Sequence, residues 1–139
     1  HLFFGKRFET FCRKLVPKLT LPFVVEKVGP WWGFCREEGQ RKEIEIDLVG
    51  INRLQKRIMF FECKWRDLKK KEAKNIIENL KSKARFVEWS KKEREEHYGL
   101  FAKRIAGKTG LRKEGFLVFD FDDFKEFVRG CPSGQRGQA

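Results

Sequence analysis

The sequence predicts an α/β (or α+β) domain in which helices flank a mixed central β-sheet, giving a three-layer sandwich. Two observations carry this prediction. Helical and extended patterns follow each other in the order helix, three strands, helix, two strands, helix, and two of the strands are joined by a turn short enough to require antiparallel pairing. A chain of 139 residues suits one core, so we expect one domain over residues 1–131 and a flexible, low-complexity tail over residues 132–139.

The N-terminal segment has the spacing of an amphipathic helix. Its apolar side chains recur every three or four residues over residues 4–19, which is one face of a helix. Pro17 lacks the backbone donor that a helix interior needs, so the helix is expected to end or bend near residue 15 or 16. Residues 21–28 are then expected to form a strand, which the turn-forming pair Gly29-Pro30 ends.

The middle of the chain predicts two paired strands. After an expected polar loop over residues 36–42, residues 43–50 and residues 57–65 alternate, and a polar turn over residues 52–56 joins them. In the first strand, one predicted face carries Ile44, Ile46 and Leu48 and the other carries Glu45, Asp47 and Val49. In the second, one face carries Ile58, Phe60, Glu62 and Lys64 and the other carries Met59, Phe61, Cys63 and Trp65.

The remaining elements complete the sandwich. Asp67 is expected to cap a long helix that reaches about residue 90. A strand over residues 97–105, a loop over residues 107–115 and a buried strand over residues 116–120 are expected next. The acidic cluster after the last strand, Asp120, Asp122 and Asp123, fits helix capping better than a metal site, with Asp122 or Asp123 as the cap.

The net charge of the chain limits the classes of partner that it is expected to bind. Lys and Arg number 32 against 20 Asp and Glu, which gives a formal net charge of +12 and favours a phosphate-bearing partner, nucleic acid first. A membrane surface is the alternative, but no apolar run approaches the roughly 20 residues of a spanning helix and no signal peptide is recognisable. Four scattered cysteines, without metal-ligand spacing, then fit reduced thiols in the cytoplasm rather than a zinc site.

The residues with a chemical implication are Asp47, Glu62 and Lys64. Glu62 and Lys64 lie two residues apart and share a strand face, and antiparallel pairing can bring Asp47 opposite or diagonal to Glu62. Two carboxylates that close can hold a hydrated Mg²⁺ (or Mn²⁺), and Lys64 can hold the attacking water or offset charge on a phosphodiester. The alternative is that Lys64 only forms an ion pair at a sheet edge.

The spacing of these residues resembles a known motif. Asp47, fourteen intervening residues and then Glu62-Cys63-Lys64 look like the Asp…(Asp/Glu)-x-Lys motif of the restriction-endonuclease-like, PD-(D/E)xK, superfamily. The wider strings over residues 43–49 and 61–65, with Val-Gly-Pro-Trp-Trp at residues 28–32, resemble the uncharacterised C-terminal domain of archaeal AAA-type ATPases. This resemblance covers roughly residues 4–85.

The resemblance implies a fold and a set of roles. It implies the restriction-endonuclease-like sandwich, Asp47 and Glu62 as metal ligands, Lys64 as the catalytic lysine and Glu9 of the first helix as a further ligand. For Glu9 the alternative is a solvated helix side chain. The resemblance also implies an ATPase domain in the parent chain, and a homodimer, which many members of the superfamily form.

Two further features have both a functional and a structural explanation. Trp31, Trp32 and Trp65 can stack on bases, or they can serve the core. A basic flank of the long helix can follow a phosphate backbone, or it can be a solvated charged face: Lys70, Lys74, Lys81 and Arg85.

Three functions therefore compete. The first is a metal-dependent nuclease domain that cleaves DNA phosphodiesters and forms the C-terminal part of a larger ATPase chain. The second is a non-catalytic nucleic-acid-binding or regulatory domain of an archaeal ATPase that keeps the nuclease fold. The third is a protein-interaction domain whose basic surface meets an acidic partner.

Overall fold

The computed structural model describes residues 2–129, and within them a five-stranded mixed sheet has the order β1-β2-β3-β4-β5. The first three strands pair antiparallel, and β3, β4 and β5 pair parallel. The strands are β1 (Lys27–Glu37), β2 (Gln40–Asn52), β3 (Arg57–Leu68), β4 (Glu95–Ile105) and β5 (Leu117–Phe119).

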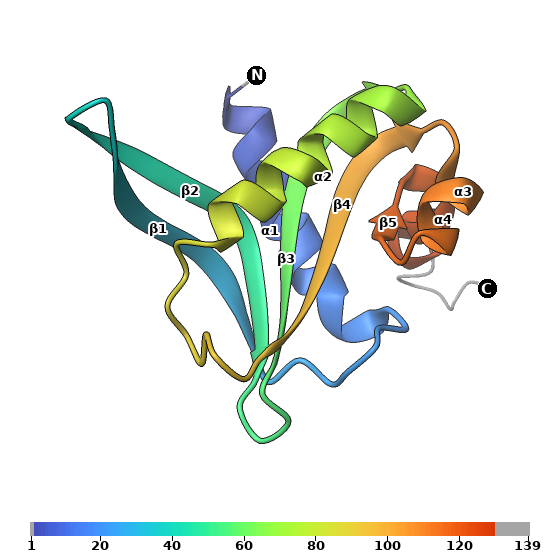
Figure 1. Cartoon of the computed structure of the whole chain (residues 1–139). Coiled ribbons are helices and arrows are strands. Elements are labelled where there is room, and N and C mark those ends of the chain that lie inside the picture. The colour runs from blue at the N-terminus through green and yellow to red at the C-terminus, as the bar shows by residue number, and fades with distance from the viewer. Residues whose placement is uncertain (1, 130–139) are drawn as a thin grey trace.

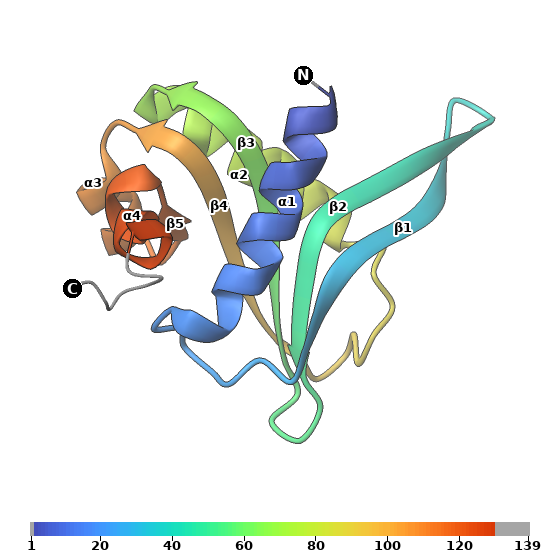
Figure 2. The same cartoon turned by 180° about the vertical axis from the view of Figure 1, so that it is seen from behind.

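Helices cover both faces of this sheet, which confirms the predicted sandwich (Figures 1 and 2). On one face α1 and α4 pack through Phe8, Cys12 and Phe124 onto the side chains of the central strands. On the other face α2 packs through two apolar clusters, one of which includes Leu111 of α3. The helices are α1 (Leu2–Leu15), α2 (Lys70–Ala84), α3 (Lys108–Lys113) and α4 (Phe121–Arg129), with a short 3-10 turn at Val16–Lys18. Of the helices described here, none has the length and apolar content needed to cross a bilayer.

The N-terminal helix ends where Pro17 predicts, at Leu15, but the strand predicted over residues 21–28 is wrong. β1 begins only at Lys27 and runs through Pro30. It can do so because it is an edge strand and because β2 places two residues, Asp47 and Leu48, opposite Pro30. Such a β-bulge interrupts the ladder at the position where proline has no N–H to donate.

The polar loop predicted over residues 36–42 is mostly strand. β1 continues to Glu37 and β2 starts at Gln40, so Glu38 and Gly39 alone make the turn. Both turn residues have positive φ, 52° and 79°, as a two-residue hairpin turn requires. The result is a long hairpin whose outer half we call the hairpin arm, residues 31–46.

The hairpin arm separates from the rest of the sheet. β2 pairs with β3 from Asn52 to Leu48, whose partner is Phe61, and beyond that point the strands diverge. Figure 1 shows β1 and β2 leaning away from β3 above the level where all three run side by side. We call this point of divergence, marked by Asp47 on β2 and Glu62 on β3, the strand fork.

The bulge also changes which side chains share a face. On β3 the prediction is confirmed, because Ile58 and Phe60 lie in the cluster under α2 while Met59, Phe61 and Cys63 lie in the cluster under α1. On β2 the prediction fails beyond the bulge. Ile46 packs under α2, but Leu48 packs under α1 and Val49 under α2, because the extra residue of the bulge reverses the alternation at that point.

The C-terminal half differs from prediction mainly at element ends. α2 begins at Lys70, where the Glu72 carboxylate accepts the Lys69 N–H at 2.8 Å, and it ends at Ala84 rather than near residue 90. The expected loop after β4 contains α3. The cap of α4 is Asp120, which accepts the Asp122 N–H at 3.1 Å, while Asp123 accepts the Asp120 N–H at 2.8 Å. The predicted tail over residues 132–139, and Cys131, lie outside the described residues.

Gly99 on β4 tests the packing of the parallel half of the sheet. A Cβ atom there would lie 2.3 Å from the Leu117 carbonyl oxygen and 2.4 Å from the Phe61 ring. Gly99→Ala is therefore expected to lower the free energy of unfolding by about 3 kcal/mol in urea denaturation. Gly29→Ala, whose Cβ would meet nothing within 4 Å, is the matched control and should change it far less. Equal effects of the two substitutions would contradict the described packing.

Candidate functional site

The side chain of Asp47 connects the two strands at the strand fork. Its Oδ2 accepts a hydrogen bond of 2.8 Å from the backbone N–H of Cys63. Because β2 has already left β3 at this level, that N–H has no ladder partner on β2, and an unpaired buried N–H is costly. The carboxylate therefore replaces a strand carbonyl, and this fixes Asp47 beside the residues that flank Cys63.

Glu62 is the most unusual side chain at the fork. It is only 4% exposed, and Lys83 Nζ donates to its Oε2 at 3.1 Å. Burial, followed by the charge of the nearby Asp47 and hydrogen bonding with it, raises the pKa of Glu62 to about 7, although Lys83 acts in the opposite direction. Two carboxylates thus lie side by side while the Lys83 ammonium contacts only Glu62, which is an environment that favours a further cation.

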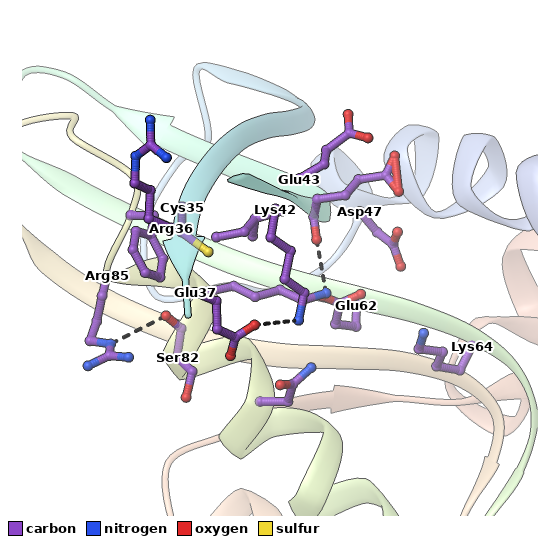
Figure 3. Close-up of a pocket in the computed structure, with 15 residues that line it drawn as sticks. Cys35, Arg36, Glu37, Lys42, Glu43, Asp47, Glu62, Lys64, Ser82 and Arg85 are labelled. Carbon is purple, nitrogen blue, oxygen red and sulfur yellow. Dashed lines mark hydrogen bonds and ion pairs between the residues drawn. The ribbon is translucent and has the colours of Figure 1, made fainter. Parts of the chain in front are cut away.

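Lys64 lies two residues further along β3 and lines the same cavity as Asp47 and Glu62. This cavity, of about 650 Å³, lies between the hairpin arm and the C-terminal half of α2. Figure 3 shows Glu62 and Lys64 on the β3 side, with Arg36 and Arg85 toward the opposite end. The predicted trio of Asp47, Glu62 and Lys64 is therefore brought to one cavity.

Glu9 approaches the fork from the other face of the sheet. It shares a smaller cavity of about 180 Å³ with Asp47, Glu45 and Trp32. Partial burial, and then the charge of Asp47, raise the pKa of Glu9. Asp47 lines both cavities, whereas Glu9 lines one and Glu62 the other. Within residues 2–129 no group of three or more His, Cys, Asp and Glu side chains is placed to hold a metal ion.

The basic flank predicted on α2 is mostly engaged with its own chain. Lys74 pairs with Glu114, Lys81 contacts Glu78 Oε2 at 3.4 Å, and the Lys70 side chain packs against Gly107 and Gly110. Of these four predicted residues, Arg85 is the one that lines the larger cavity. A role of the flank in nucleic-acid binding stays a prediction. Among the four residues, Arg85 is the best placed for such a role, because it lines the cavity at the strand fork.

Lys83 is the site residue that the sequence reasoning missed. Its ammonium bridges the Glu62 carboxylate and the Glu45 carbonyl, at 3.1 Å and 2.9 Å, and so ties the end of α2 to both strands of the fork. The signal was present in the helical spacing. Lys83 follows Ile76 and Leu80 at intervals of four and three residues, which places a lysine at the border of the buried stripe.

Together these features define the class of protein. It is an α/β sandwich in which two carboxylates and two lysines line one cavity, at the point where two antiparallel strands diverge. The chain belongs to the DUF234 family of archaeal and bacterial proteins of unknown function, whose model matches residues 1–76. That match covers the first helix and every residue of the trio. It does not reach Lys83.

One curated relative extends the comparison beyond the family match. An uncharacterized protein of Methanocaldococcus jannaschii is 32% identical over 126 residues, which cover 88% of this chain and 26% of the relative. The chain thus spans about a quarter of the length of that relative. No solved structure matches the chain at a significant level.

The pKa of Glu62 predicts how stability depends on pH. The folded state raises this pKa from 4.5 to about 7, so the protonated form is favoured on folding. The resulting stabilisation is fully present below pH 4.5 and is lost as the pH rises through 7. From pH 4.5 to 7.5, wild type should lose roughly 3 kcal/mol of unfolding free energy relative to Glu62→Gln in urea titrations.

The matched control for this measurement is Glu43→Gln, which neutralises an exposed acid on β2. It should follow the wild-type profile. A Glu62→Gln profile parallel to wild type over the same pH range would show that Glu62 does not titrate as described.

Proposed function

We propose that the chain is a metal-dependent phosphodiesterase domain with a restriction-endonuclease-like fold, acting on DNA. The observation that carries the proposal is the convergence of Asp47, Glu62 and Lys64 on one cavity at the strand fork. The net charge of +12 supports a polyanionic substrate. The sandwich with a mixed sheet agrees with the fold that the motif implies.

The residues at the fork fit a Mg²⁺ or Mn²⁺ ion. Asp47 and Glu62 would hold it, because carboxylate oxygens are the ligands that hard cations prefer and because the buried Glu62 gains by neutralisation. Mg²⁺ commonly keeps several waters and takes ligands from substrate phosphate, so two protein carboxylates can suffice. When bound, the ion supplies polarisation of the phosphoryl group and a lowered pKa for coordinated water.

The other residues of the chain act on the substrate and on the carboxylates. Lys64 faces the same cavity, where its ammonium group can hold the attacking water or offset the charge that builds on the phosphoryl oxygens. Glu9 completes the acidic surroundings of Asp47 from the α1 side. The Cys63 N–H fixes one carboxylate oxygen of Asp47 and so keeps this carboxylate beside Glu62.

Lys83 has a distinct role in this proposal. Its ammonium lies on the carboxylate that would bind the metal, so it neutralises Glu62 until a divalent cation replaces it. With a side chain 27% exposed, it can then turn toward the cavity and a substrate phosphate.

The alternative function is a non-catalytic nucleic-acid-binding module, and the same ion pair favours it. If Lys83 permanently satisfies Glu62, the fork is a structural ion-pair network without a metal. The parent chain is a further part of the proposal. A relative about four times the length of its match is consistent with an ATPase domain elsewhere in such proteins, and the edge strand β1 leaves room for a homodimer.

Cleavage assays decide between these two functions. With Mn²⁺ present, wild type is expected to cut labelled DNA, tested as single strands, duplexes and branched forms. Asp47→Ala should lower the rate by about 100-fold or more, because it removes a ligand and the partner of the Cys63 N–H. Asp122→Ala, which removes an exposed acid of α4, is the control and should cleave normally. Unchanged cleavage by Asp47→Ala, or none by wild type, would refute the nuclease proposal.

Metal titration tests the place of Lys83. Lys83→Met should raise the affinity for Mn²⁺ by about tenfold in isothermal calorimetry, because no charged hydrogen bond has to be broken for the cation to bind. Lys81→Met, on the same helix but directed to Glu78, should leave the affinity unchanged. An affinity that falls in Lys83→Met would show that the ammonium supports metal binding rather than competing with it.

A further inference from the structure

Two aromatic rings on the hairpin arm are exposed although the chain has an aromatic core. Trp32 is 54% exposed and Phe34 is 53% exposed. They lie two residues apart on β1, so they project from the same face of the strand. The other two tryptophans predicted as stacking candidates serve the core instead, since Trp31 packs on the cluster under α2 and Trp65 lies 5.0 Å from the Phe8 ring.

Both exposed rings are held in place by polar contacts. The Trp32 Nε1 donates to Glu45 Oε2 at 2.8 Å on the paired strand. The Arg41 guanidinium stacks on the Phe34 ring, 3.8 Å from its centroid. Rings fixed in this way lose little conformational entropy when a flat ligand packs against them. The surface is therefore organised for stacking before any ligand arrives.

This aromatic surface continues toward the strand fork. Trp32 shares the smaller cavity with Asp47, and the α1 side of that cavity carries Lys6 and Arg13. Glu45, paired with Trp32, is two residues from Asp47 along β2, or about 7 Å at the rise of a strand. An extended chain of stacked bases can bridge such a distance, with its phosphates near the α1 cations.

Charge indicates which form of nucleic acid fits. The hairpin arm carries three basic residues, Arg36, Arg41 and Lys42, against four acidic ones, Glu37, Glu38, Glu43 and Glu45. It is therefore no basic track for a duplex backbone, and its contribution is the exposed rings. Bases within a duplex present their faces to each other, whereas an unpaired strand presents them to aromatic side chains.

We propose that Trp32 and Phe34 form a stacking surface for unpaired bases of single-stranded DNA, with Lys6 and Arg13 contacting its phosphates. The surface delivers the strand to the fork, so its biological meaning rests on the proposed nuclease function. The substrate class of the domain is then DNA with a single-stranded segment, such as a free end or a flap.

The test measures binding without catalysis. Fluorescence anisotropy of a labelled oligothymidylate with the 139-residue chain, in EDTA, excludes any metal-dependent cleavage. The double variant Trp32→Ala, Phe34→Ala should weaken single-strand binding by about 30-fold, the effect of two lost stacking contacts. Leu54→Ala, an 89% exposed apolar residue in the turn at the other end of β2, is the matched control and should bind as wild type does.

A conservative pair keeps the test independent of folding. Trp32→Phe with Phe34→Tyr retains both rings and should retain most of the affinity, while the alanine pair loses it. Equal binding by wild type and the alanine pair overturns the inference, as does an equal loss of duplex binding, or binding of an apolar peptide in place of DNA.

The two proposals fail separately. If single-strand binding depends on the two rings but the chain does not cleave DNA with Mn²⁺, the stacking surface is supported and the nuclease proposal is refuted. Cleavage that depends on Asp47, with single-strand binding indifferent to the rings, does the reverse.

Discussion

The hydrogen bond from the Cys63 N–H to the Asp47 carboxylate is the contact on which the rest of the site depends. The bulge opposite Pro30 ends the regular alternation of β2 at this level, and β2 then diverges from β3. A divergence between two strands leaves backbone groups without partners, and a side-chain carboxylate is the group that satisfies one here. The same carboxylate thereby lies beside Glu62. Asp47 thus both satisfies the backbone at the fork and contributes a carboxylate to the candidate site.

A second constraint is the burial of negative charge. The Glu62 side chain is almost fully buried beside the Asp47 carboxylate, and the Lys83 ammonium compensates only part of the negative charge of the pair. The arrangement is costly for a purely structural network, since buried ion pairs are often no better than apolar packing. Such an arrangement suits the proposed site, in which a metal ion replaces the Lys83 ammonium at Glu62. The hairpin arm, freed by the same divergence, then provides the wall of the cavity and the exposed rings.

The sequence predicted those features that depend on periodicity. The faces of β3, the antiparallel pairing with β2, the end of α1 near Pro17 and the shared position of Asp47, Glu62 and Lys64 all follow from alternation and turn chemistry. The bulge could not be predicted from the sequence. The pair Gly29-Pro30 looks like the end of a strand unless β1 is known to be an edge strand, where proline is tolerated. Residues 36–42 at the tip of the hairpin arm were mistaken for a loop because all seven are polar or glycine. Lys83 was missed because its partner, Glu62, is distant in sequence and the contact depends on how α2 lies on the sheet.

We propose that the fork binds a divalent cation between Asp47 and Glu62, and paramagnetic broadening by Mn²⁺ in two-dimensional NMR can locate such an ion. The amide signals of residues 46–48 and 61–64 are expected to broaden first, at substoichiometric Mn²⁺, and Asp47→Asn is expected to abolish this selectivity. Broadening centred instead on Asp120, Asp122 and Asp123 at the start of α4, or spread evenly over the acidic surface, would show that the fork does not bind the cation.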